Sequence, residues 1–338
     1  MSLDATTLDW LLDSDPAIRW QVERDLQGAP PEVWEATRAR VSREGWGARL
    51  LAKQGADGQW AGGAYFPGES WQGDPAPDEP PHPDDDGEQA QPWIATTWSL
   101  TSLREWGADP AVLGDTAERI DAVSRWEYDE LPYWSGEVDA CINGMTLANG
   151  QWLGADPEKL ALLRQWFLDH EMAEGGWNCA WVDGSTRASF HSTINTLKGL
   201  LAFEELVGGD AELAAARHRG EAYLLERHLL FRASTGDKVA PWATHVAYPF
   251  RWVYSAMNAL DHFRRAAAHD GAEPDPRLAE AVEAVHADRQ ADGTWIQERR
   301  HPGRVWFEVD VPVGERSKWL TLYGTRVLDW WDAARTAA

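Results

Sequence analysis

Asp139 and Cys141 are two chemically capable residues that stand two positions apart, in the stretch EVDACING at residues 137–144. Cys141 is one of only two cysteines in the chain. The stretch is typical of the first turn of a helix, and three interpretations are open. The pair holds a metal ion, or Asp139 is a buried acid, or both residues are ordinary, an aspartate that caps a helix and a cysteine that packs in the core.

The elements that must position this pair recur along the chain. Three segments have the same Gly-to-Trp turn, KQGADGQW (53–60), MAEGGW (172–177) and DRQADGTW (288–295), and DELPYW (129–134) and TGDKVAPW (235–242) are looser copies. We expect a helix before each turn, and several of these helices begin at Asp-Pro, a favourable helix start. The expected ranges are 32–53, 110–126, 157–170, 210–232 and 275–290.

A second set of helices is expected after the turns. These helices cover 91–107, 137–154, 188–208, 248–265 and 316–333, with a sixth near Asp15-Pro16. They are poor in charge, whereas the first set carries the Arg, Glu and Asp residues, so the two sets indicate an inner and an outer ring. We therefore predict an all-α protein in which residues 1–338 form a single α/α toroid of about six helical hairpins. The N-terminal ends of the inner helices would surround a central pocket.

Two segments interrupt this pattern. Residues 66–91 are rich in Pro and acidic residues and lack an apolar period, which predicts a loop, with a lid over the pocket as one interpretation. The run Asp84-Asp85-Asp86 lies in this loop and lacks the helical framework that a magnesium site would need. Residues 301–314 alternate in polarity and predict a short extended hairpin.

Composition excludes some classes of partner. The chain has 31 basic and 55 acidic residues, a formal net charge of −24, which argues against a nucleic acid or an anionic membrane surface. No apolar run is long enough to predict a transmembrane segment, and no signal peptide is visible at the first residues. Two cysteines cannot form a disulfide framework, so we expect a cytoplasmic protein.

The repeats resemble those of a known group of enzymes. Gln54, Gly58 and Trp60, and the shortened set Gln290, Gly293 and Trp295, resemble the QW repeats of squalene–hopene cyclases and of protein prenyltransferase β subunits. Both families are α/α toroids, so the resemblance implies the same fold. DGQWAGG (57–63), followed by QPWIATTWSLTSL (91–103), is similar to the Gly-rich turn and inner helix of a prenyltransferase β subunit.

The prenyltransferase resemblance implies a zinc site. In that family an Asp-x-Cys at one helix start and a His at the next hold Zn²⁺, and Asp139, Cys141 and His191 match this pattern. Carboxylate, thiolate and imidazole are good zinc ligands, and three of them leave a fourth position for a substrate or water. Cys179 is a weaker candidate ligand, because a buried turn thiol also explains it. Residues 129–138 lack the basic residues that hold a prenyl diphosphate in that family.

The cyclase resemblance implies a different role for the same helix. There an Asp-x-Asp-Asp motif protonates the substrate, and Asp139 would be the catalytic proton donor, although Glu137 and Ala140 replace the flanking acids. Three functions therefore stay open. They are a zinc enzyme that acts on an apolar, isoprenoid-type small molecule, a metal-free cyclase, and a toroid that only binds a lipid or a protein. Prenyltransferases also need a second subunit, so a protein partner stays open.

Further polar and aromatic residues are expected on the inner helices. Their side chains either bind the substrate in the pocket, with Arg251 as an anion anchor and aromatic rings as cation–π partners, or pack at the rim of the ring. The candidate substrate-binding residues are Trp98, His245, Tyr248, Arg251, Tyr254, Tyr323 and Arg326.

Overall fold

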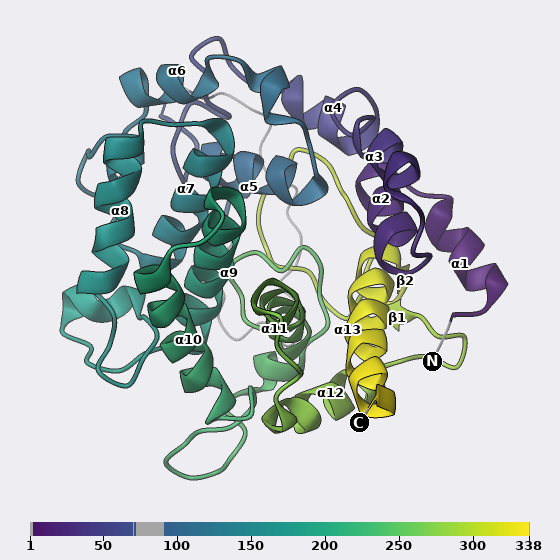
Figure 1. Cartoon of the computed structure of the whole chain (residues 1–338). Coiled ribbons are helices and arrows are strands. Elements are labelled where there is room, and N and C mark those ends of the chain that lie inside the picture. Colours follow the sequence, from purple (N-terminus) through teal and green to yellow (C-terminus); the bar gives the residue numbers. More distant parts are fainter. Residues whose placement is uncertain (1–2, 70, 72–90, 338) are drawn as a thin grey trace. The chain divides into compact units, whose positions relative to one another are not determined.

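The computed structural model describes residues 3–69, 71 and 91–337 (Figure 1). These residues form thirteen α-helices, several short 3₁₀ turns and one sheet of two short strands. The prediction of an all-α protein is confirmed. The expected loop at 66–91, including Asp84-Asp85-Asp86, lies largely outside the described residues, so its interpretation as a lid stays a prediction.

The chain divides into two compact units. The first unit comprises Met1–Arg40, Ala222–His301 and Val309–Ala338, and the second comprises Val41–Glu221 and Pro302–Glu308. The helices that lie wholly in the first unit are α1 (Ala5–Leu12), α2 (Pro16–Asp25), α3 (Pro31–Arg38), α11 (Ala256–Asp270), α12 (Ala279–Ala287) and α13 (Lys318–Ala337). Those in the second unit are α4 (Gly45–Leu51), α5 (Thr96–Trp106), α6 (Thr116–Val123), α7 (Ala140–Leu153), α8 (Pro157–Asp169) and α9 (Phe190–Val207). Helix α10 (Ala211–Leu225) carries the chain from the second unit into the first.

Buried and exposed helices alternate along the second unit. Most residues of α5, α7 and α9 are buried, whereas α6 and α8 bury only three residues each. Helix α7 contacts α5 on one side and α9 on the other (Figure 1). The charge-poor helices expected to be inner helices are therefore the buried ones in this unit, as the sequence predicts.

The closest helix contact in the second unit joins α7 and α9. A Cβ atom added to Gly199 would lie 2.3 Å from the main-chain oxygen of Gly144, so only glycine permits this approach. One turn earlier, the Thr196 hydroxyl donates to the Ala140 carbonyl at 3.2 Å. Because contacts advance in the same direction along both helices, α7 and α9 are parallel and their N-terminal ends lie at the same end of the unit.

The three Gly-to-Trp turns have one structure. Each indole N–H donates to a carbonyl ten residues earlier, in the preceding helix, at 2.8–3.0 Å: Trp60 to Leu50, Trp177 to Phe167, and Trp295 to Val285. Each Trp main-chain N–H donates at 3.1 Å to a threonine of the next buried helix: Thr96, Thr193 and Thr321. All three rings are fully buried, and a glycine with φ between 82° and 86° forms each turn. The internal repeat read from the sequence is therefore real.

The predicted bounds of two elements are wrong. The predicted helix 248–265 begins only at Ala256, as α11, because Ser255 caps it and Pro249 disfavours a helical residue before it. The predicted hairpin at 301–314 is absent from that range. The only described strands, β1 (Trp295–Ile296) and β2 (Arg316–Ser317), pair with each other on either side of it. Pro302 and Pro312 lack the N–H groups that a ladder needs.

Four expected outer helices are shorter than predicted, and the range 210–232 forms only α10, Ala211–Leu225. The range 32–53 is split into α3 and α4, since Gly45 begins α4 with φ +61°. The ranges 110–126 and 275–290 each begin with a 3₁₀ turn, Pro110–Leu113 and Pro276–Leu278, before α6 and α12. The Asp-Pro starts are nevertheless placed as predicted, because Asp109, Asp156 and Asp275 each accept a main-chain N–H through the side chain.

Candidate functional site

The start of α7 leaves the Asp139 side chain free of a capping role. Asp139 is the N-cap residue, yet its carboxylate makes no capping hydrogen bond. Instead, the Glu137 carboxylate accepts the Asp139 main-chain N–H at 2.5 Å, and Asn143 holds Glu137 through two hydrogen bonds to its main chain. The Asp139 side chain therefore does not cap the helix, although capping is the ordinary interpretation of an aspartate at this position.

Cys179 joins Asp139 and Cys141 at this helix start. It begins the 3₁₀ turn Cys179–Asp183, and its Sγ lies 3.3 Å from the Sγ of Cys141, 38 positions earlier in the chain. The Cys179 thiol also lies within hydrogen-bond reach of the Asp139 carboxylate and favours its charged form. Both cysteines are free thiols and partly exposed. The chain thus brings its only two cysteines and a carboxylate together.

The first turn of α9 supports Cys179 from the other side. The Ser192 hydroxyl accepts the Cys179 main-chain N–H at 3.0 Å and lies 3.3 Å from its sulfur. His191 is the residue before Ser192, and its carbonyl accepts a hydrogen bond from Asn195. His191 therefore belongs to the same turn that contacts Cys179. Among the described residues, the ligand atoms of Asp139, Cys141 and His191 do not all lie within 4.8 Å of one another.

Burial shifts the acid–base properties of this cluster toward neutral forms. Burial raises the pKa of Asp139, with the hydrogen bond from Cys179 acting against it. Burial also raises the pKa of Glu137 to about 7. The hydrogen-bonded contact with Cys179, which favours the neutral thiol, and then burial raise the pKa of Cys141 well above its usual range. A cation placed here would reverse these shifts, because it favours the charged form of each group.

An aromatic wall borders the cluster. Tyr65 is nearly buried, and its ring packs on Trp98 with the centroids 5.0 Å apart. Trp93 meets Trp98 edge to face at 4.8 Å. Burial, and then the nearby Cys141, raise the pKa of the Tyr65 phenol, which places this hydroxyl within electrostatic reach of the thiols. Within the described part of the chain, the indole N–H of Trp98 is buried without a hydrogen-bond partner.

One carboxylate holds the loop that carries Tyr65. A single oxygen of Glu127 accepts the main-chain N–H groups of Ala64, Tyr65 and Phe66 at 2.9–3.0 Å. Three donors to one oxygen fix the path of this loop, since a charged acceptor makes each bond stronger than a neutral one. The position of the Tyr65 side chain is therefore built into the fold of the second unit.

The remaining predicted substrate-binding residues lie in the first unit. Tyr248 is buried and stacks on Trp319 with centroids 4.5 Å apart, and the Tyr254 hydroxyl donates to the Leu229 carbonyl at 2.8 Å. His245 Nδ1 lies 2.5 Å from an Arg299 nitrogen. These contacts are packing and support contacts within this unit, and the helical spacing expected for Arg251 and Tyr254 is wrong because both precede α11.

Arg326 is a buried structural cation in the first unit. Its guanidinium makes two hydrogen bonds to Asp261, at 2.6 and 2.8 Å, and a third to Gln21 at 3.1 Å. Its face lies 4.0 Å from the ring centroid of Tyr323. These partners occupy the planar donor groups of Arg326, so the geometry gives it a role in joining α2, α11 and α13.

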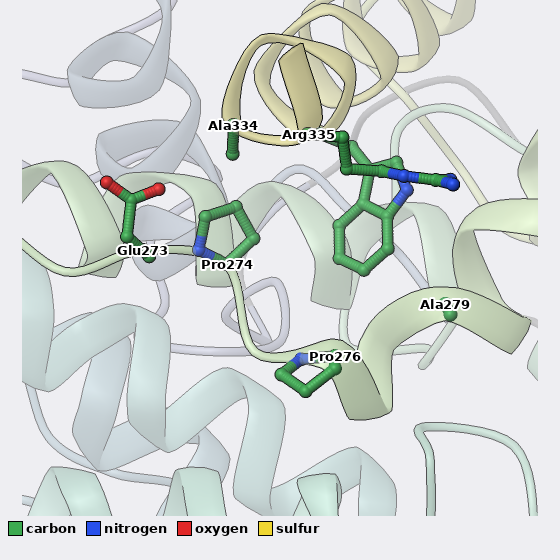
Figure 2. Close-up of a pocket in the computed structure, with 7 residues that line it drawn as sticks. Glu273, Pro274, Pro276, Ala279, Ala334 and Arg335 are labelled. Carbon is green, nitrogen blue, oxygen red and sulfur yellow. The ribbon is translucent and has the colours of Figure 1, made fainter. Parts of the chain in front are cut away.

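A cavity of about 640 Å³ lies elsewhere in the first unit (Figure 2). It lies between the end of α13, with Ala334 and Arg335, and the connection from α11 to α12, with Pro274 and Pro276. Glu273 and Arg335 stand on opposite sides of it in Figure 2. None of the predicted site residues lines this cavity. Its walls are mainly apolar and hold no cluster of catalytic groups.

Comparison of the chain with protein-family models, with curated proteins and with solved structures finds no match. Over the residues that the structure describes, no helix is both long and apolar enough to cross a membrane.

Proposed function

We propose that the chain is a zinc enzyme of the toroid type that acts on an apolar, isoprenoid-like small molecule at the start of α7. The observation that carries the proposal is the contact of Cys179 with both Cys141 and Asp139. Two thiols and a carboxylate that converge from separate elements are a donor set that suits zinc.

The ligands proposed are Asp139, Cys141 and His191, as the resemblance implies, together with Cys179. A tetrahedral zinc ion with two thiolate ligands needs sulfur atoms about 3.8 Å apart, close to the 3.3 Å found here. Among the described residues, the ligand atoms of Asp139 and Cys141 do not lie within 4.8 Å of one another together with those of either His191 or Cys179, so binding requires rotation of at least one side chain. Zinc would supply Lewis acidity toward a substrate oxygen or sulfur.

The chain's own residues would bind and orient the substrate. The rings of Tyr65, Trp93 and Trp98 offer an apolar, electron-rich wall, which suits an isoprenoid chain. The unpartnered indole N–H of Trp98 is a donor for one acceptor atom of the substrate. Residues 129–138, directly before Asp139, contain no Lys or Arg, so we do not assign a diphosphate to this substrate.

An α/α toroid over residues 1–338 remains our proposal for the architecture. Buried and exposed helices alternate in the second unit, and three equivalent Trp turns join helices in both units. Both features agree with hairpins that repeat around a ring. Small-angle scattering of the monomer would test it, since a closed ring is more compact than two separated units.

Metal analysis of the purified protein tests the zinc site. We expect about one equivalent of zinc per chain, because a set of this kind binds one ion. Cys141→Ser, Cys179→Ser and His191→Ala should each lower the zinc content severalfold or more. Asp183→Asn, in the same 3₁₀ turn as Cys179 and exposed, is the matched control and should retain the metal.

Circular dichroism of each variant shows whether a loss of zinc comes from the missing ligand or from unfolding of the chain. A folded wild-type protein that contains no zinc, and binds none when zinc is added at micromolar concentration, would contradict the zinc proposal. Zinc that survives in all three ligand variants would place the metal elsewhere in the chain and would contradict it as well.

A second candidate function is proton donation by Asp139 without a metal. The raised pKa of Asp139 favours it, because it increases the share of the protonated carboxylic acid, which is the form that can donate a proton to an alkene. The two functions differ in their need for the thiol. If an acyclic isoprenoid polyene is converted by wild-type protein and by Cys141→Ser but not by Asp139→Asn, acid catalysis is supported. Loss in both variants favours zinc.

A further inference from the structure

We infer that Cys141 and Cys179 form an oxidation site, in which a peroxide converts the two thiols into an intramolecular disulfide. The inference goes beyond the proposed function, since it concerns the dithiol itself and holds for the metal-free protein. The two cysteines are the only ones in the chain, so they define one possible bond.

The two sulfur atoms are already in contact. They lie 3.3 Å apart, whereas a disulfide is about 2.05 Å long, so closure requires the sulfurs to approach by about 1.3 Å. Rotation of one or both cysteine side chains moves a sulfur by this amount. Neither residue lies in the middle of a long helix, because Cys141 is the second residue of α7 and Cys179 begins a 3₁₀ turn.

The site is open to a small oxidant. Both cysteines are partly exposed residues, so we expect a small hydroperoxide to reach at least one of the two sulfurs. The Ser192 hydroxyl lies 3.3 Å from Cys179 Sγ and holds that side chain beside Cys141. The Cys179 main-chain N–H bond to the same hydroxyl fixes the turn as well.

The chemistry balances with hydrogen peroxide as the oxidant. One thiol loses its proton and attacks a peroxide oxygen, the O–O bond breaks, and a sulfenic acid and one water form. The second thiol then attacks the sulfenic sulfur, an S–S bond forms, and the hydroxyl leaves as a second water. Two electrons pass from the two sulfurs to the peroxide.

Oxidation would also control the proposed metal site. A disulfide offers no thiolate, so it cannot bind zinc through Cys141 and Cys179. This consequence rests on the proposed function, whereas the disulfide does not. Bound zinc should in turn protect both thiols from peroxide.

Thiol counting by mass spectrometry tests the inference. Reduced, chelator-treated protein is exposed to a small excess of hydrogen peroxide, then alkylated under denaturing conditions. We expect a monomer that is two hydrogens lighter, takes up no alkylating agent, and regains both thiols with dithiothreitol. Cys141→Ser and Cys179→Ser should each keep a single thiol or its sulfenic acid, with no disulfide in the monomer.

If the cysteine variants fail to fold, a comparison of the native with the urea-unfolded wild-type protein still tests the inference. The disulfide should form on the order of tenfold faster or more in the native wild-type chain, because unfolding separates the cysteines by a loop of 38 residues. Independent oxidation of each cysteine to a sulfinic acid, disulfide-linked dimers, or equal rates in urea would each overturn the inference. Thiol counting does not depend on zinc content. A protein that binds no zinc but forms the disulfide would therefore contradict only the proposed function.

Discussion

The buried pair of Arg326 and Asp261 is the residue-scale interaction with the most consequence for stability. Arg326 is only 5% exposed and Asp261 6% exposed. Burial alone raises the pKa of Asp261, but Arg326 and Arg264 outweigh it and hold the pKa well below its ordinary range. Removal of Arg326 leaves the buried Asp261 with Arg264 as its hydrogen-bonded cation. Removal of Asp261 leaves the buried Arg326 with Asp25 at 3.4 Å, so either change weakens the compensation of a buried charge.

We expect Arg326→Met to lower the free energy of unfolding at pH 7 by up to about 3–5 kcal/mol, the range for an uncompensated buried charge, since Arg264 still pairs with Asp261. Because the Asp261 pKa is depressed in the folded state, the stabilisation is fully present above the unfolded carboxyl pKa, about 4. It is lost as the pH falls below that value toward the folded pKa. Urea unfolding at pH 7 and at pH 3 should therefore show a smaller difference between wild type and variant at pH 3.

The exposed pair of Arg277 and Asp275 provides the control in the same unit. Arg277→Met should cost less than about 1 kcal/mol at pH 7, because solvent screens this pair. An effect of Arg326→Met no larger than that of Arg277→Met would contradict the role assigned to the buried pair.

Among single residues, the sequence predicted that Asp139 and Cys141 lie together at a helix start, but it did not predict that Cys179 contacts Cys141. The two cysteines meet only because the turn after Trp177 folds back over the start of α7, and no local pattern encodes that contact across 38 positions. Tyr65 was missed for the same reason, since Glu127 positions its loop from about 60 residues away. The scarcity of cysteine was the available signal, because the chain has only two cysteines and both lie in segments that the sequence assigns to one candidate site.

At the scale of elements, the sequence predicted best what is encoded locally. The Gly-to-Trp turns and the Asp-Pro helix starts depend on a few adjacent residues, and both are where the sequence placed them. The start of α11 depends instead on distant partners. Tyr248 is held by Gln297 and by stacking on Trp319, and these contacts hold the segment before Ala256 in a non-helical path.

The close contact of α7 and α9 gives an element-scale prediction. Gly199→Ala would place a methyl group against the Gly144 main chain, and both helices would have to move apart. We expect a loss of about 1–3 kcal/mol in the free energy of unfolding, measured by urea denaturation. The movement should also increase the Cys141–Cys179 separation and slow disulfide formation.

Leu206→Ala, at the exposed end of α9, is the matched control and should change stability by less than about 0.5 kcal/mol. Stabilisation by Gly199→Ala, as expected for alanine in an uncrowded helix, would show that the two helices do not approach as closely as described.

At the scale of the whole molecule, the first and last segments of the chain belong to one unit. Helix α2 contributes Gln21 and Asp25 to the Arg326 cluster on α13, and Leu11 and Ile18 are fully buried. A chain that lacks residues 1–40 should therefore fail to form the first unit. We expect it to lose near-ultraviolet circular dichroism from buried Trp and to aggregate, whereas a soluble, cooperatively unfolding product would contradict this expectation.

Because the first unit is made of separate stretches of the chain, its parts are synthesised at different times. The ribosome makes residues 1–40 first, but their partners in α11 and α13 emerge only after the long central segment. The main segment of the second unit is by then complete and can fold on its own timescale. The first forty residues must wait, with the apolar faces of α1 and α2 uncovered, until α13 has left the exit tunnel. We therefore expect residues 1–40 to be the segment of this unit that stays without its partners for longest during synthesis, and so to be the segment most prone to aggregation.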